Sequence, residues 1–283
     1  MNWLHATLLG IVEGITEFLP ISSTGHLNVV ERLLGYEIDS AGMTAFTAII
    51  QVGAIIAAIV YFWSDIVRIV VGWFVGLRDA SRRDADYRLG WGVILGSIPV
   101  AVVGLLFKHQ IETTLRNLWV IIGALVLWSA VMWVADRAQT RVERAGDARS
   151  MTDVTIKDAV FIGFFQALSP LFPGISRSGA TISAGLFRRF DRVTATRLSF
   201  FLGIPALVAA GGLEAATQFG NVSTTVGWTA TGIALVVSFV VAYAAIAWLL
   251  RFVSKNNFTA FIVYRLVVAA VLAVLVLSGK LSA

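Results

Sequence analysis

Six apolar stretches, each about as long as a helix must be to cross a lipid bilayer, constrain this chain more than any other feature of its sequence. Roughly 20 mostly apolar residues in a helix cross a hydrocarbon core about 30 Å thick. The predicted spans cover residues 41–63, 89–107, 118–135, 198–213 with an extension over 193–197, 226–250 and 258–277. A continuous apolar run of this length satisfies its backbone hydrogen bonds in lipid as a helix. The predicted fold class is therefore an all-α polytopic membrane protein.

The composition agrees with this class and argues against several others. Hydrophobic residues make up 58% of the 283 residues and charged residues 14%, whereas soluble proteins contain roughly 45–50% and about 25%. The absence of cysteine and the presence of only three histidines argue against a disulfide framework and a zinc hydrolase. The net charge of +5 is expected from the cationic cytoplasmic loops of a membrane protein, so no nucleic-acid partner is predicted.

Two further apolar regions, residues 3–35 and 160–187, are each interrupted by proline and resemble each other. The sequence GIVEGITEFLP followed by SSTG, which starts at Gly10, matches GFFQALSPLFP followed by SRSG, which starts at Gly163, with a one-residue gap. Each region precedes three predicted spans. Because proline frees backbone groups that lipid cannot satisfy, each region is predicted to form a re-entrant helix hairpin whose break faces a polar cavity.

The chain is therefore interpreted as a single integral membrane domain, residues 1–283, that contains two repeats. The repeats cover residues 1–135 and 158–283, and the charged loop 136–157 joins them. Sixteen of the 22 Lys and Arg residues fall in loops on one side of the membrane. The four on the other side are Arg32, Lys108, Arg116 and Lys280. Because cytoplasmic loops are rich in Lys and Arg, both termini are predicted outside, and the repeats, which begin on opposite sides, have inverted topology.

Two acidic residues open the motif EGITEFLPISSTGH at residues 13–26. Glu13 and Glu17 are four residues apart, so they share one face of a helix. An ionised group at bilayer depth is costly, and neighbouring carboxylates either share a proton or hold a cation. The alternative is a helix at the membrane surface whose two glutamates are solvated.

Three hydroxyls and a histidine complete this motif. Ser22, Ser23 and Thr24 can cap the following half-helix, whose free N–H groups form an anion site. His26 is close enough in sequence to serve as general base or acid toward one of these hydroxyls. The alternative is a capped turn beside a hydrogen-bonded histidine.

The second broken region carries PGISRSGAT at residues 173–181. Arg177 offers a planar fork of donors that suits phosphate oxygens, and an arginine at the start of a half-helix is repelled by the helix dipole unless an anion is present. The hydroxyls of Ser176, Ser178 and Thr181 add donors. The alternative for Arg177 is a structural ion pair with Glu13 or Glu17, which is compatible with a resting state.

Other polar residues in apolar segments receive simpler interpretations. Gln51 and Gln166 are expected to make hydrogen bonds between helices, and Gln166 matches Glu13 in the repeat alignment. Arg265 is expected to extend toward the lipid headgroups from the inner end of the last span. Residues 66–77 are typical of a helix at the membrane surface.

The two motifs, at residues 13–26 and 173–181, resemble the signature motifs of the undecaprenyl-diphosphate phosphatases, the bacitracin-resistance family. The resemblance covers almost the whole chain in length, span pattern and motif placement. It implies an enzyme in the bacterial cell membrane that hydrolyses a polyprenyl diphosphate to the monophosphate and inorganic phosphate. This reaction recycles the lipid carrier for peptidoglycan and confers resistance to bacitracin. The family's active site opens toward the outer face, in agreement with the charge distribution.

The resemblance also implies roles for single residues. Glu13 and Glu17 would form the carboxylate site for a divalent cation, Mg²⁺ or Ca²⁺. Ser23 and His26 would act at the reacting phosphate, and Arg177 would hold the diphosphate. The neighbours expected to contact phosphate are Ser22, Thr24, Ser176, Ser178 and Thr181. Whether Ser23 or His26 is the nucleophile stays open, as does the formation of a homodimer.

A transporter or flippase for polyprenyl phosphates is the alternative function, because inverted repeats with broken helices suit it equally well. The Ser-x-x-His sequence beside an arginine and two carboxylates is more than anion binding needs, so the phosphatase is favoured. Phosphoryl transfer depends mostly on positioning and on charge stabilisation, which these groups supply. The expected partners are the polyprenyl diphosphate and membrane lipid.

Overall fold

The computed structural model describes residues 1–38, 40–107, 117–218, 226–279 and 281, and within this part the chain is helical without strands. Six described helices are long and apolar enough to cross a membrane. They are α3 (Ala41–Tyr61), α5 (Ala85–Leu106), α7 (Leu118–Arg144), α11 (Arg192–Gln218), α13 (Trp228–Val253) and α14 (Thr259–Leu277). The predicted all-α polytopic class and the six predicted spans are confirmed.

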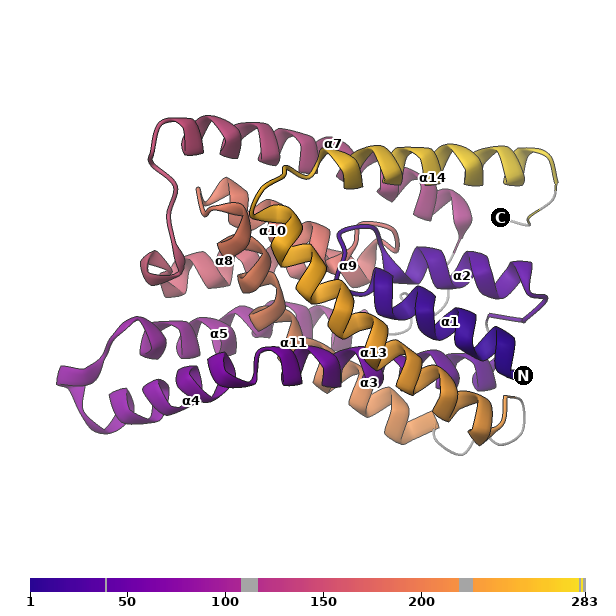
Figure 1. Ribbon diagram of the computed structural model, residues 1–283, viewed down its shortest axis with the longest axis horizontal. Coiled ribbons are helices and arrows are strands. Elements are labelled where there is room, and N and C mark those ends of the chain that lie inside the picture. Colours follow the sequence, from indigo (N-terminus) through magenta and orange to yellow (C-terminus); the bar gives the residue numbers. More distant parts are fainter. Residues whose placement is uncertain (39, 108–116, 219–225, 280, 282–283) are drawn as a thin grey trace.

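Two broken hairpins occupy the regions that the proline positions predict. The first consists of α1 (Trp3–Thr16) and α2 (Ser23–Leu33). The second consists of α8 (Ile156–Gln166), the single turn α9 (Leu168–Leu171) and α10 (Arg177–Phe187). Helix α1 enters from the end that holds the N-terminus and α8 from the opposite end, and the two breaks meet near the middle of the molecule (Figure 1).

Close backbone packing fixes both α1 and α3 against α13. A Cβ atom added at Gly10 would lie 2.6 Å from the carbonyl oxygen of Ala234, and one at Gly14 would lie 2.8 Å from that of Ser238. A Cβ at Gly53 of α3 would overlap the carbonyl oxygen of Leu235. Glycine is therefore required at these contacts, as is typical of helix pairs in lipid. This packing sets the position of the helix that carries Glu13 and Glu17.

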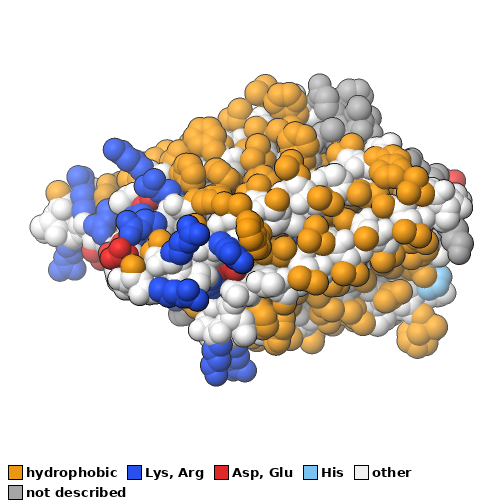
Figure 2. Space-filling model, turned by 90° about the horizontal axis from the view of Figure 1, so that it is seen from above, with side chains coloured by type: hydrophobic (Ala, Val, Ile, Leu, Met, Phe, Trp, Pro, Cys, Tyr) orange, Lys and Arg blue, Asp and Glu red, His pale blue; other side chains and the backbone are white. Residues whose placement is uncertain are grey.

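Lys and Arg side chains gather at one end of the molecule, at the left in Figure 2. The chain segments that follow α4 (Trp63–Arg78), α7 and α10 lie at this end (Figure 1). Helix α1 begins and α14 ends at the other end (Figure 1). The asymmetry found in the sequence is therefore also a spatial one, although Lys108, Arg116 and Lys280, and also His109, lie outside the described residues.

Two helices at the cationic end differ from simple membrane spans. Helix α7 continues to Arg144 and so includes the first residues of the predicted loop 136–157. Asp136 and Gln139 are buried in this extension, so the helix continues with polar residues packed against the rest of the protein. Helix α4 occurs where a surface helix is predicted over residues 66–77, and Val71 on its apolar face is exposed.

Ion pairs fix the start of α8 at this end. The buried carboxylate of Asp158 accepts from Nη2 of Arg149 and from Nε of Arg188, each at 2.6 Å, and from the hydroxyl of Thr155 at 2.7 Å. Burial alone would raise the pKa of Asp158, but the hydrogen bonds from Arg149, Thr155 and Arg188 outweigh it and hold the pKa well below its ordinary value. Asp158 is therefore an ionised anchor for the second hairpin.

Candidate active site

Each broken hairpin turns into its second helix through a serine in the same unusual conformation. Ser22 has φ of 79° and Ser176 has φ of 72°, in the left-handed region that glycine normally occupies. Each serine caps the helix that follows, since Ser22 Oγ accepts from the backbone N–H of Gly25 at 3.4 Å and Ser176 Oγ from that of Gly179 at 3.2 Å. The predicted capping role of Ser22 is confirmed. Such backbone strain, about 1–3 kcal/mol per residue, is typical of functional sites.

The carboxylate of Glu17 joins the two hairpins. Ser23 Oγ donates to Glu17 Oε2 at 2.8 Å, and Nη2 of Arg177 lies 3.5 Å from Glu17 Oε1. Gln51 Nε2 of α3 lies 3.5 Å from Oε2 of the same carboxylate. The structure thus brings together Glu17, Ser23 and Arg177, three of the residues that the motifs predict. Arg177 is paired to Glu17, which is the ion pair that the sequence left as the alternative and which is compatible with a resting state.

Both motif glutamates are buried, Glu13 with 1% and Glu17 with 6% of its surface exposed. The alternative in which both are solvated at the membrane surface is therefore wrong. Within the described part of the chain, Glu13 Oε1 and Arg177 Nε are buried without a hydrogen-bond partner. Such atoms are rare in folded proteins. They leave one acceptor and one donor free for a ligand.

His26 lies on α2 with both ring nitrogens engaged. Its Nδ1 is 2.7 Å from the carbonyl oxygen of Ser22, and its Nε2 is 2.8 Å from the hydroxyl of Tyr264. A carbonyl only accepts, so Nδ1 carries the proton and Nε2 of the neutral ring accepts from the tyrosine. The rings of His26 and Tyr264 are also stacked, with their centroids 5.6 Å apart. The arrangement corresponds to the hydrogen-bonded histidine that the sequence left as an alternative.

The hydroxyls predicted to contact phosphate mostly bond within the protein. Ser176 Oγ and Ser178 Oγ are 3.0 Å apart, and Ser178 also donates to the carbonyl oxygen of Leu19 at 2.9 Å, which ties the second hairpin to the first. Thr181 Oγ1 donates to Ser199 Oγ of α11 at 2.6 Å. Thr24, in contrast, is exposed. These contacts build the frame in which Arg177 is held.

A glycine on α11 makes room for the guanidinium of Arg177. A Cβ at Gly203 would overlap Nη1 of Arg177 and lie 2.7 Å from its Cζ. The same Nη1 donates to the carbonyl oxygen of Ser199 at 3.3 Å. The guanidinium therefore lies directly against the backbone of α11, in a position that only glycine at residue 203 allows.

The sequence missed several contacts of this site. Gln51 and Gln166 were expected to bond between helices, which is confirmed: Gln166 Nε2 donates to the carbonyl oxygen of Leu202 at 3.3 Å. That Gln51 reaches Glu17 was not foreseen, nor were the roles of Gly203 and Tyr264, for which the sequence carries no signal.

Two expectations about charged groups come out differently. Arg265 does not extend toward the headgroups, because it is fully buried and bonded to backbone carbonyls near the breaks. In the described part of the chain, no group of three or more His, Cys, Asp and Glu side chains is arranged to hold a metal ion. A cation at Glu13 and Glu17 would therefore need further ligands, such as phosphate oxygens.

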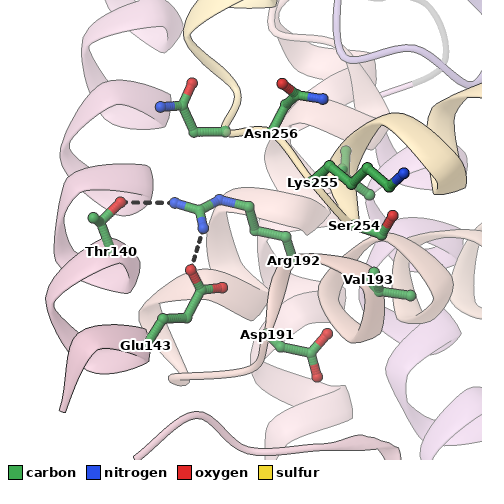
Figure 3. Close-up of a pocket in the computed structure, with 10 residues that line it drawn as sticks. Thr140, Glu143, Asp191, Arg192, Val193, Ser254, Lys255 and Asn256 are labelled. Atoms are coloured by element: carbon green, nitrogen blue, oxygen red, sulfur yellow. Dashed lines mark hydrogen bonds and ion pairs between the residues drawn. The ribbon is translucent and has the colours of Figure 1, made fainter. Parts of the chain in front are cut away.

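A cavity of about 390 Å³ lies away from this site, at the cationic end (Figure 3). Arg192 of α11 lines it and is paired with acidic groups of α7: its Nε donates to Asp136 Oδ1 at 2.8 Å, and it forms an ion pair with Glu143. Its Nη2 donates to Thr140 Oγ1 at 2.7 Å. The charge of Arg192 is balanced by these acidic groups, so this cluster joins α11 to α7.

Comparison with known proteins agrees with the resemblance of the motifs. The family model described as bacitracin resistance protein BacA matches residues 6–271. The chain is 64% identical to an undecaprenyl-diphosphatase of Cutibacterium acnes over the whole of both chains. It is 56% identical to undecaprenyl-diphosphatase 3 of Frankia casuarinae and 46% identical to an undecaprenyl-diphosphatase of Mycobacterium sp. strain KMS, again over the full length of each.

Proposed function

This chain belongs to the bacitracin resistance protein BacA family, and from that membership we propose that it is an integral membrane hydrolase of undecaprenyl diphosphate. The reaction yields the monophosphate and inorganic phosphate and returns the lipid carrier to cell-wall synthesis. The observation that carries the proposal is the contact of Ser23 with Glu17, whose other carboxylate oxygen faces Arg177. The names of the relatives favour this enzyme over the transporter alternative.

In the proposed reaction, Ser23 acts on the terminal phosphate of the lipid. The hydroxyl oxygen attacks the terminal phosphorus, its proton passes to Glu17, and the bond to the polyprenyl monophosphate breaks. Water then hydrolyses the phosphoserine and releases inorganic phosphate. Arg177 stabilises the charge on the transferred group, with its unpartnered Nε as a further donor. His26, held by Tyr264, fixes the first turn of α2, and its Nε2 is the second candidate for proton transfer.

A divalent cation fits the acidic side of this site. Glu13 has a buried carboxylate oxygen without a partner, and carboxylates with phosphate oxygens are the ligands that Mg²⁺ and Ca²⁺ prefer. We propose that Glu13 and Glu17 hold the cation together with the diphosphate. When bound, the cation would supply charge stabilisation to the phosphoryl group.

We further propose that residues 1–135 and 158–283 are inverted repeats. Each hairpin precedes three spans, and α1 and α8 enter from opposite ends (Figure 1). The concentration of cations at one end supports a cytoplasmic location for that end. Both termini would then lie outside the bacterial cell membrane, and the site would open to the outer face, where the family's site opens.

The test is phosphate release from a polyprenyl diphosphate by the detergent-purified chain. The wild type should release phosphate, Ser23→Ala should abolish release, and Ser254→Ala, at an exposed hydroxyl of the cationic end, should leave it unchanged. A wild-type protein that binds the lipid without releasing phosphate would contradict the phosphatase and favour the transporter alternative.

The nucleophile is identified with substrate that carries a radiolabelled terminal phosphate. If Ser23 attacks, a rapid acid quench leaves the label on the protein, because phosphoserine is stable in acid. Acid-labile, base-stable label that disappears in His26→Ala would assign the attack to the histidine.

A further inference from the structure

Arg265 of α14 is a fully buried arginine whose five N–H donors all have acceptors, none of which is a carboxylate. Its Nη1 donates to the carbonyl oxygens of Pro20 and Ile175, each at 3.2 Å. Its Nη2 donates to the carbonyl oxygens of Gly174 at 2.9 Å and Leu125 at 3.3 Å. Its Nε donates to Ser129 Oγ at 3.1 Å. One guanidinium thus contacts the first break, the second break and α7.

Three of the four carbonyls that it binds, those of Pro20, Gly174 and Ile175, lie at the breaks, whereas Leu125 belongs to the continuous helix α7. Pro20 lies three residues before Ser23, and Gly174 lies three residues before Arg177. A carbonyl freed at a break inside the membrane has no water to bond to, and leaving it unsatisfied costs several kcal/mol. Arg265 satisfies carbonyls of both turns with a rigid planar group, so it also fixes the distance between them.

Two further contacts surround Arg265, one from the neighbouring residue of α14 and one made directly between the two turns. The preceding residue, Tyr264, donates to His26. The two turns also touch directly through Ser178 and Leu19. A neighbouring pair on α14 therefore contacts both hairpins at the positions from which Ser23, His26 and Arg177 project.

We propose that Arg265 is a positioning residue that holds the two broken turns in register, so that Ser23 of the first hairpin faces Arg177 of the second. The expected effect of Arg265 on turnover rests on the proposed phosphatase function. Its expected effect on the structure of the two turns does not depend on that function. Arg265 touches neither Ser23 nor Glu17 through any contact named above, and it acts through the backbone.

The experiment compares Arg265→Lys with Arg192→Lys in detergent-purified full-length protein. Both arginines are buried and join helices through several acceptors, but Arg192 lies in the cluster at the cationic end (Figure 3). Deuterium uptake is measured by mass spectrometry on peptides that cover residues 17–25 and 172–180. The values of kcat and KM for phosphate release and the Tm are measured on the same preparations.

A lysine has one ammonium group and cannot reach carbonyls of both turns in this geometry. Arg265→Lys should therefore raise deuterium uptake about fivefold or more in both turn peptides. It should also lower kcat at least about tenfold, with a smaller change in KM, because the reacting groups lose alignment. Arg192→Lys should lower the Tm while uptake in both peptides and kcat stay within about twofold of wild type.

The proposal is overturned if either turn peptide of Arg265→Lys keeps the wild-type uptake, or if kcat stays within about twofold while the Tm falls as in Arg192→Lys.

If Arg265→Lys does not fold, Ser129→Ala removes one acceptor of Arg265, with Thr196→Ala as control because that buried hydroxyl bonds within its own helix. Ser129→Ala should loosen both turns and Thr196→Ala neither; equal uptake in the two would refute the role. If the wild type releases no phosphate, the proposed function is wrong, and the uptake of the two turns still decides the role of Arg265.

Discussion

Replacing Gly203 by alanine tests whether the position of the Arg177 guanidinium controls the reaction. The added Cβ would overlap Nη1 of Arg177 and approach Cζ to 2.7 Å. Carbon and nitrogen atoms that are not bonded need about 3.5 Å. The guanidinium therefore has to move by more than about 1 Å, away from Ser199 and relative to Glu17. A misplacement of about 1 Å can lower a rate about 100-fold, which corresponds to about 2.7 kcal/mol in the activation free energy.

The fold should tolerate this change, because the overlapping atoms belong to the end of a flexible side chain. Alanine is also more favourable than glycine in a helix interior by roughly 0.5–1 kcal/mol. The Tm of Gly203→Ala should thus stay close to that of the wild type while kcat/KM for phosphate release falls. The matched control is Gly212→Ala on the same helix, where an added Cβ meets no atom of the described chain within 4 Å.

Two results would refute this reasoning. Activity within about twofold of wild type would mean that Arg177 does not hold this position during turnover. A large fall in Tm would mean that the helix backbone and not the guanidinium gives way. If the effect acts through Arg177, adding Gly203→Ala to Arg177→Ala should cost little more than Arg177→Ala alone.

Four further predictions concern charge. Arg177→Lys keeps the charge but not the planar fork, so phosphate release should fall at least about tenfold; near wild-type rates would disprove bidentate binding. Excess chelator should abolish phosphate release by the wild type, and added Mg²⁺ or Ca²⁺ should restore it. The same cations should restore less activity in Glu13→Gln than in the wild type. Full wild-type activity in excess chelator would exclude a role for the cation in the reaction. A cysteine at Arg141 should react with an impermeant maleimide only after cells are permeabilised, and labelling in intact cells would reverse the topology. The pKa of Asp158 is lowered in the folded state, so its stabilising effect is complete above its unfolded pKa of about 4 and is lost as the pH falls below that value. The Tm of the wild type should therefore approach that of Asp158→Asn in acid, and a constant difference between them would contradict this.

The membrane-spanning part of the fold could be predicted because lipid imposes one rule, a long apolar helix, on every span. That rule placed the six spans, and the prolines within the two remaining apolar regions placed both breaks. The rule did not show that the helix α7 continues beyond residue 135 to Arg144, since a helix that leaves the lipid can continue by burying polar residues such as Asp136. A hydropathy pattern does not detect this kind of packing.

The site could be predicted only in part. The two motifs named Glu17, Ser23 and Arg177, which meet. The sequence could not show what holds them, because Gly203 is one of many glycines in apolar segments and its function is only to leave space. Arg265 was misjudged because an arginine in an apolar segment normally reaches the headgroups, and the acceptors that it meets are backbone carbonyls, which have no signature in the sequence.

The pair of Glu17 and Arg177 has a consequence for the proposed reaction, because the substrate would replace one anion at Arg177 by another. Without substrate, the carboxylate is the counter-ion of a guanidinium that is largely buried. In the proposed reaction, an incoming diphosphate would compete for the same guanidinium, and Glu17 would be released when Ser23 needs an acceptor for its proton. When inorganic phosphate departs, the carboxylate would return to Arg177, so the buried guanidinium would not be left without a counter-ion at a cost of several kcal/mol. Glu17 would thus compete with the product as well as with the substrate, and this competition would limit how tightly the enzyme retains the phosphate that it has released.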